Sequence, residues 1–201
     1  MRLIENQLAP DFIFTDHRGN QSSLYKELSE GPVYLTFLRF ASCPHCNLRI
    51  SKLIERHGKI RQSGVRVISV IESSEKNFAC HAGKQEIQFP VILDQKKKLY
   101  NLYDLERSWL GILKGFTVKA PQLIEAFSKG FYPGKPDGTF NRMPADFFLR
   151  QDGIIDRAYY GSDPGDHLPF DDVMQFGRIQ KIMEISPVLQ FHTSMDEKIA
   201  V

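Results

Sequence analysis

"RFASCPHCNLRI", residues 39–50, is the stretch that decides the fold of this 201-residue chain. An apolar run, "PVYLTFLRF" (32–40), leads into it and is typical of a strand buried on both faces. After the cysteines, a helix is predicted, because its expected inward-facing residues recur with the spacing of one helix face: Cys46, Ile50, Leu53, Ile54 and His57. Cys43 and Cys46 therefore lie where a buried strand ends and a helix begins, an edge at which reactive groups collect in open α/β sheets.

Strands and helices alternate along most of the chain. Strand–helix pairs are expected over residues 9–28, 32–64, 65–85 and 89–105. This order indicates a parallel sheet with right-handed crossovers. "DFFLRQDGIIDRAYYG" (146–161) then predicts an antiparallel hairpin around a tight turn, and residues 168–184 predict a closing helix. The fold class is therefore α/β, with a central mixed sheet flanked by helices.

Residues 108–142 break this alternation just before the hairpin. "LIEAF" (123–127) predicts one helix, whereas "YPGKPDGTFNR" (132–142) is dense in Pro, Gly and Asn and predicts a loop. The segment is too short for a core of its own, so it is interpreted as an insertion into a single domain over residues 1–184. Residues 185–201 form a C-terminal tail without a clear pattern.

Composition and charge narrow the function classes. The chain is 42% hydrophobic and 25% charged, its net charge is +2, and its apolar runs are too short to cross a bilayer. Lys96–Lys98 is the one basic cluster and is interpreted as a solvated helix start, so neither nucleic acid nor membrane is expected as a partner. The N-terminus has no secretory h-region, and three cysteines do not make a disulfide scaffold, which together favour the cytoplasm.

Four uses of the cysteine pair are conceivable: haem attachment, zinc binding, a buried inert pair and redox chemistry. Haem attachment needs a histidine directly after the second cysteine, where this chain has Asn47. Zinc needs a second ligand pair, for which only Cys80 and His81 are candidates, so no metal and no cofactor are expected. The first turn of a helix favours a thiolate, and His45 adds positive charge when protonated. Redox chemistry is therefore the preferred interpretation, with Cys43 as the more exposed cysteine of lower pKa.

Several segments together resemble the redoxin and alkyl hydroperoxide reductase/thiol-specific antioxidant group of the thioredoxin-like superfamily. They are "APDF" with its following D-x-x-G turn, the strand before the cysteines, "FPVILDQKKKLYNLY", and "MPADFFLRQDGIIDRAYYG". The resemblance covers roughly residues 5–165 without the insertion. It implies a thioredoxin-like fold and a thiol-dependent antioxidant oxidoreductase with a redox-active disulfide.

The resemblance leaves two candidate attacking thiols. The peroxiredoxin motif P-x-x-x-T-x-x-C, laid over this site, places the peroxidatic cysteine on Cys46, with Arg39 in place of the Pro and Cys43 in place of the Thr. Thioredoxin would instead attack with Cys43. The dipeptide Pro44-His45 also resembles the active site of strongly oxidising periplasmic disulfide oxidoreductases.

Further residues receive supporting roles from the resemblance. Met143-Pro144 occupies the place where thioredoxin-like proteins carry a cis-proline beside the thiols, the alternative being a loop proline that starts a strand. Arg39 and Arg142 are candidates to place a guanidinium beside the thiolate. Cys80 is a candidate resolving cysteine. The remaining histidines of interest, His57 and His167, are interpreted as structural or surface residues.

The main hypothesis is a peroxiredoxin-like enzyme that reduces a hydroperoxide and ends as a Cys43–Cys46 disulfide. A thioredoxin-type dithiol would then reduce this disulfide. The alternatives are a protein disulfide oxidoreductase and a non-enzymatic thioredoxin-fold binding module. A homodimer, with residues from Ile185 onward as its arm, is a further possibility.

Overall fold

The computed structural model describes residues 2–185, and its core is a five-stranded sheet with the order β5-β4-β3-β6-β7. The strands are β3 (Val33–Phe37), β4 (Arg66–Ile71), β5 (Val91–Leu93), β6 (Ala145–Leu149) and β7 (Ile155–Tyr160). β3, β4 and β5 run parallel, whereas β6 is antiparallel to β3 and β7 is antiparallel to β6. The predicted mixed sheet and C-terminal hairpin are therefore confirmed.

β3 lies at the centre of the sheet, and all five of its residues are buried. Leu35 is opposite Ile68 of β4 on one side and Phe147 of β6 on the other. A strand enclosed on both faces and both edges explains the continuous apolar run in the sequence. The cysteine motif that follows it therefore starts from the fully buried central strand of the sheet.

The prediction that the first strand belongs to the parallel sheet is wrong. β1 (Ile13–Thr15) pairs antiparallel with β2 (Gln21–Ser23) in a separate two-stranded sheet that precedes α1 (Leu24–Ser29). The turn between the two strands is held by Asp16, whose Oδ1 accepts hydrogen bonds of 2.9 Å from the backbone N–H groups of Arg18 and Asn20. This tight turn reverses the chain after three residues, so β1 pairs with its own continuation.

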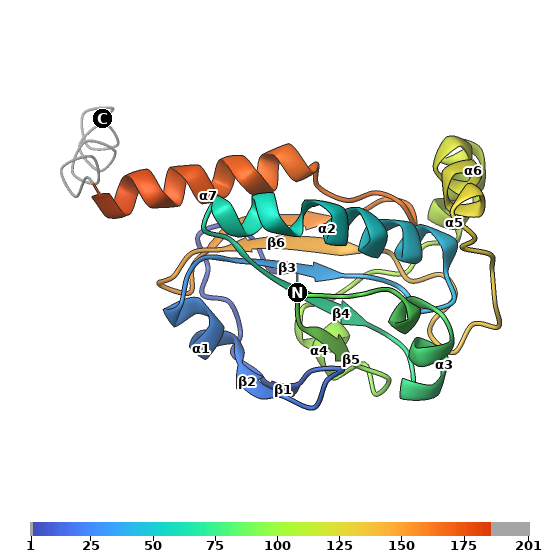
Figure 1. Ribbon diagram of the computed structural model, residues 1–201, viewed down its shortest axis with the longest axis horizontal. Helices are drawn as coiled ribbons and strands as arrows, with labels where there is room; N and C mark the ends of the chain where they lie inside the picture. Colours follow the sequence, from blue (N-terminus) through green and yellow to red (C-terminus); the bar gives the residue numbers. More distant parts are fainter. Residues whose placement is uncertain (1, 186–201) are drawn as a thin grey trace.

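Helices cover both faces of the five-stranded sheet (Figure 1). α2 (Pro44–Gln62) and α7 (Phe170–Ile185) lie on one face, while α1, α4 (Lys98–Leu102) and the β1–β2 hairpin lie on the other. α3 (Glu75–Cys80) is shorter than predicted and is followed by a 3-10 turn, Ala82–Lys84, because His81 leaves the helical conformation with φ −125° and ψ −95°. None of these helices is both long and apolar enough to span a membrane.

The insertion contains two helices instead of the one predicted. α5 (Trp109–Thr117) and α6 (Ala120–Ser128) stand near the N-terminal end of α2 (Figure 1). Two glycines weaken the sequence signal for α5. They are needed for close packing, because a methyl group on Gly111 would lie 2.5 Å from the Ser162 carbonyl oxygen, and one on Gly115 would lie 2.5 Å from Pro164. The tail suggested as a dimer arm lies outside the described residues, apart from Ile185.

Candidate active site

The cysteine pair occupies the start of α2, directly after the loop that leaves β3. Cys43 is the N-cap residue, with extended backbone angles of φ −83° and ψ 125°, and Pro44 is the first helical residue. Proline suits this position because its missing N–H would have no helical partner. Cys46, in the same turn, points into the domain and is 1% exposed. The sequence prediction of a strand end followed by a helix start is confirmed.

Arg39 contacts both sulfur atoms. Its Nη1 donates to Cys43 Sγ at 3.3 Å, and its backbone N–H donates to Cys46 Sγ at 3.3 Å. The guanidinium also donates to the Phe140 carbonyl oxygen and lies close to the rings of both Phe40 and Phe140, at 5.0 and 5.7 Å from their centres. Arg39, predicted as one of two candidate guanidinium donors, is therefore fixed beside the thiols by a residue of the insertion.

These contacts shift the pKa values of the two thiols in opposite directions. A hydrogen bond from Cys46 and the charge of Arg39 lower the pKa of Cys43 well below its usual value, despite burial. Burial, followed by the hydrogen bond and the negative charge of Cys43, raises the pKa of Cys46. The order agrees with the sequence prediction that Cys43 has the lower pKa. The pair is thus arranged as a Cys43 thiolate that accepts a hydrogen bond from the Cys46 thiol.

His45 is a weaker source of positive charge than the sequence suggested. Its ring is buried, and this burial lowers the pKa of His45. The imidazole is therefore largely neutral at pH 7. Among the charges that act on Cys43, Arg39 ranks above His45. The permanent guanidinium charge is the principal cationic partner of the thiolate.

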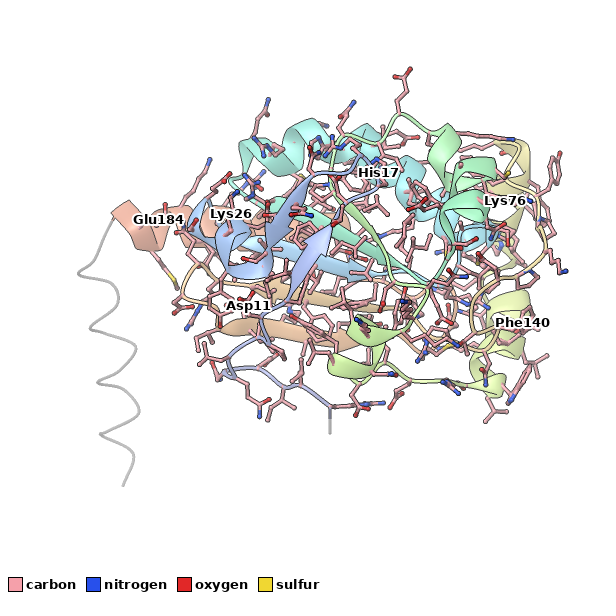
Figure 2. The ribbon with its side chains drawn as sticks, turned by 90° about the horizontal axis from the view of Figure 1, so that it is seen from below. Asp11, His17, Lys26, Lys76, Phe140 and Glu184 are labelled. Carbon is pink, nitrogen blue, oxygen red and sulfur yellow. The ribbon has the colours of Figure 1, made fainter. Side chains whose placement is uncertain are left out.

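The prediction that Cys43 lies at an open, solvent-accessible lip is wrong, because Cys43 is only 2% exposed. The insertion folds over the helix start and encloses a cavity of about 110 Å³ against Cys43. Its wall is mainly apolar and includes Ile112 of α5, Leu123 and Phe127 of α6, Phe140, and Pro133, Pro136 and Pro164. Figure 2 shows Phe140 at the end of the molecule opposite Glu184, which lies in the last turn of α7. A small apolar group fits this space, whereas a folded protein surface does not reach the sulfur.

Asp137 attaches the insertion loop to the start of α3. Its carboxylate accepts hydrogen bonds from the Ser73 hydroxyl at 2.6 Å, the Ser74 backbone N–H at 2.8 Å and the Asn77 side-chain amide at 2.6 Å. Burial opposes ionisation, but these bonds lower the pKa of Asp137. An ionised Asp137 therefore serves as a helix cap donated by the insertion.

A second carboxylate, Glu72 at the end of β4, holds the neighbouring residues of the loop. It accepts hydrogen bonds of 2.6 Å from both the backbone N–H and the hydroxyl of Thr139, and one of 3.1 Å from Nε of Arg142. Burial alone would raise the pKa of Glu72, but these donors lower it. Glu72 and Asp137 together fix the cover over Cys43.

Arg142 serves this anchor rather than the thiolate in the structure. Besides Glu72, its guanidinium donates to the Leu105 carbonyl oxygen at 2.7 Å and lies 5.0 Å from the centre of the Tyr100 ring. Its hydrogen bonds thus join the insertion to the sheet. Of the two candidate arginines, the structure brings Arg39 to the cysteines.

The prediction of a cis-proline at Met143-Pro144 is wrong, because the described residues have only trans peptide bonds. The Met143 N–H donates to the Glu106 carbonyl oxygen at 3.0 Å, and the Pro144 carbonyl oxygen accepts from Gly161 at 2.9 Å. This extended segment is thus the start of β6, as in the loop-proline alternative. The Met143 N–H is paired with Glu106, a residue just before the insertion, so it does not offer a free donor to an extended substrate chain.

Cys80 is a free cysteine at the end of α3 and is exposed, in contrast to the buried pair. Among the histidines interpreted as structural, His57 lies near the surface beside Gln88, whereas His167 belongs to a buried network. Asp146 accepts from the Thr36 hydroxyl at 2.6 Å and lies 3.0 Å from His167 Nδ1. Sequence reasoning missed this dyad. Its one signal was a lone aspartate in the apolar strand "ADFFL".

A mixed sheet with a thiolate–thiol pair at the start of its central helix defines a thioredoxin-like class of thiol proteins. The sequence model of the AhpC/TSA family matches residues 6–158, and the chain belongs to this family. It is a thiol-based oxidoreductase. A search of curated protein sequences found no match.

Solved structures support the fold. A peroxidoxin, BcpB, from Mycobacterium tuberculosis has a TM-score of 0.63 at 14% identity, covering 89% of this chain and 98% of that one. A reduced 2-Cys peroxiredoxin from Plasmodium vivax has a TM-score of 0.63 at 12% identity, covering 90% and 84%. A putative thiol:disulfide interchange protein, DsbE, from Chlorobium tepidum has a TM-score of 0.59 at 17% identity, covering 88% and 99%.

Proposed function

We propose that the protein reduces small organic hydroperoxides, with Cys43 as the attacking thiolate and Cys46 as the resolving thiol. The observation that carries this proposal is the Cys43–Arg39 contact of 3.3 Å inside a small, mainly apolar cavity. The thiolate supplies the nucleophile, and the guanidinium supplies a fixed positive charge beside the O–O bond. The apolar wall suits the organic part of the peroxide.

In the first step, the Cys43 thiolate attacks the terminal oxygen of the hydroperoxide. An S–O bond forms and the O–O bond breaks, which leaves Cys43 as a sulfenic acid and releases an alkoxide that takes a proton to become the alcohol. The negative charge that develops on the leaving oxygen is stabilised by the Arg39 guanidinium. The sulfur is oxidised by two electrons, and the peroxide is reduced by two.

In the second step, the Cys46 sulfur attacks Cys43, the sulfenic oxygen leaves as water, and a Cys43–Cys46 disulfide forms. Cys46 is suited to this role because it lies in the same first turn of α2 as Cys43 and its thiol lowers the pKa of Cys43. Two electrons from two small thiols then restore both cysteines, since the cover over Cys43 keeps a protein dithiol away from the disulfide. Exposed Cys80 is not needed in this scheme.

A protein disulfide oxidoreductase is the second candidate, favoured by the lowered pKa of the first cysteine in a Cys-x-x-Cys pair. Two features weigh against it. Cys43 is covered by the insertion, and the Met143 backbone N–H already has a partner. A binding module without redox chemistry is disfavoured, because such a protein does not need the guanidinium and the second thiol that lower the pKa of Cys43.

The test combines turnover with trapping of the intermediate. Cys46→Ser in a Cys80→Ser background should consume one equivalent of a small alkyl hydroperoxide and then stop, with a dimedone adduct on Cys43 by mass spectrometry. Cys43→Ser should show no adduct and no turnover. Adduct on Cys46 in the Cys43→Ser protein would reverse the assignment, as the peroxiredoxin overlay predicts. Insulin reduction without any response to peroxide would move the function to disulfide exchange.

A further inference from the structure

A basic pocket lies next to the Cys43 cavity, and His45 lines both of them. The volume of this basic pocket is about 250 Å³. The positive charges come from α2 and from the residue before α6: Arg49, Lys52, Arg56 and Lys119. His167 and Gln122 complete the polar part of the wall. Its lining contains no Asp or Glu.

The helix positions explain why these charges converge. His45, Arg49, Lys52 and Arg56 follow the spacing i, i+4, i+7, i+11, which places them along one face of α2. The three cations of this row, Arg49, Lys52 and Arg56, repel one another along the helix face. Lys119 adds a further positive charge from the insertion.

Some of these cations have carboxylate partners outside the pocket. Lys52 lies 2.5 Å from Glu125, Arg56 lies 3.5 Å from Glu55, and Arg49 lies 4.0 Å from the buried Asp146. These carboxylates do not occupy the space that the cations share.

One buried nitrogen atom of this wall has no hydrogen-bond partner: Nε of Arg49, whose side chain is 10% exposed. Arg49 is otherwise well fixed: its Nη2 donates to the Tyr34 hydroxyl at 2.7 Å and to the Leu168 carbonyl oxygen at 2.8 Å, and it stacks 3.9 Å from the centre of the Phe170 ring. A rigid guanidinium with an unused donor is the arrangement that recognises an oxyanion.

We propose that this basic pocket binds the carboxylate of a small reactant of the enzyme, either the hydroperoxide or the thiol that reduces the disulfide. The carboxylate would pair with Arg49, Arg56 and Lys119, while the reactive end of the same molecule approaches the cysteines past His45. The role as a reactant site rests on the proposed peroxidase function. The binding of an anion in this pocket does not depend on that function.

Anion binding is tested first, without turnover. Inorganic phosphate is titrated into the reduced full-length protein by calorimetry, and into the double variant Arg56→Gln/Lys119→Gln. The matched control, Lys59→Gln/Arg61→Gln, removes the same charge from exposed positions at the end of α2, outside the pocket. We expect the pocket variant to bind phosphate about tenfold more weakly and the control to bind like wild type. No binding to wild type, or equal weakening in both variants, overturns the proposal.

Turnover then identifies the reactant. A short-chain hydroperoxy acid is compared with its methyl ester, and mercaptoacetate with its methyl ester as the reductant. A KM about tenfold lower for one acid, lost in the pocket variant with kcat little changed, supports the proposal and names that reactant. Equal KM values for acid and ester in both pairs overturn it. If no hydroperoxide is turned over at all, the proposed function fails, and the phosphate titration still decides whether the pocket binds anions.

Discussion

Replacing Arg39 by Met should raise the pKa of Cys43 and slow its reaction with peroxide. The variant keeps an unbranched side chain of similar length but removes the guanidinium that donates to Cys43 Sγ at 3.3 Å. The backbone N–H of residue 39 still donates to Cys46 Sγ, so the second contact is retained. The change therefore isolates the positive charge beside the thiolate.

The expected size follows from the contact. A hydrogen bond to a charged group contributes about 1.5–3 kcal/mol. Since one pKa unit corresponds to about 1.4 kcal/mol, the pKa of Cys43 should rise by about 1 to 2 units. The full charge–charge energy at 3.3 Å, with an effective dielectric constant of about 20, is about 5 kcal/mol. We expect a smaller loss than this in the variant, because the hydrogen bond from Cys46 still stabilises the Cys43 thiolate.

The assay follows thiolate absorbance and iodoacetamide labelling of Cys43 against pH in a Cys80→Ser background, with the labelled residue identified by mass spectrometry. Arg61→Met is the matched control, because it removes an exposed arginine from the last turn of α2, the helix that begins after Cys43. Peroxide turnover at neutral pH should fall with the thiolate fraction. An unchanged titration of Cys43 in the Arg39 variant would refute the reasoning, and the thiolate would then depend on Cys46 alone.

Three further outcomes are expected. Glu72→Gln removes the negative charge that pairs with Arg142, so the free energy of unfolding should fall by about 3 kcal/mol. A bulky maleimide should also label Cys43 faster in this variant. Unchanged labelling would contradict the role of Glu72 in fixing the insertion over Cys43. Gly58→Ala, with nothing within 4 Å of the added methyl group in α2, should raise the free energy of unfolding by about 0.5–1 kcal/mol in urea, and a loss would contradict this. Burial alone would raise the pKa of Asp146, but His167 and Arg49 lower it to about 2 from 3.8. Because the folded-state pKa is the lower one, its stabilisation is present above about pH 4 and is lost as the pH falls toward 2. Asp146→Asn should therefore flatten the acid part of the stability profile by about 2 kcal/mol, and an equal slope in both proteins would count against the dyad.

The sequence predicted those parts of the fold that local pattern determines. β3 could be recognised because burial on both faces requires apolar residues throughout, and α2 because its apolar positions follow one helix face. The order of the two thiol pKa values could also be predicted, since Cys43 occupies the helix N-cap. Each of these features depends on residues close together in the sequence.

The covered state of Cys43 could not be predicted in the same way. It depends on pairs such as Ser74–Asp137 and Glu72–Thr139, which are more than sixty residues apart and leave no periodic signal. The cis-proline prediction failed for a related reason. The hydrogen bond from the Met143 N–H goes to Glu106, which lies just before the insertion and far from Met143 in the sequence.

The insertion therefore decides the chemistry of this site as much as the cysteine motif does. Its residue Phe140 holds the guanidinium of Arg39 in place, and its helices enclose the Cys43 sulfur. A Cys-x-x-Cys pair that is open to solvent suits exchange with protein disulfides. Under the function proposed above, the same pair beneath an apolar cover and beside a fixed guanidinium admits a small peroxide and excludes a protein surface. In this proposal, the cysteine motif supplies the nucleophile, and the anchored insertion selects the molecules that can reach it.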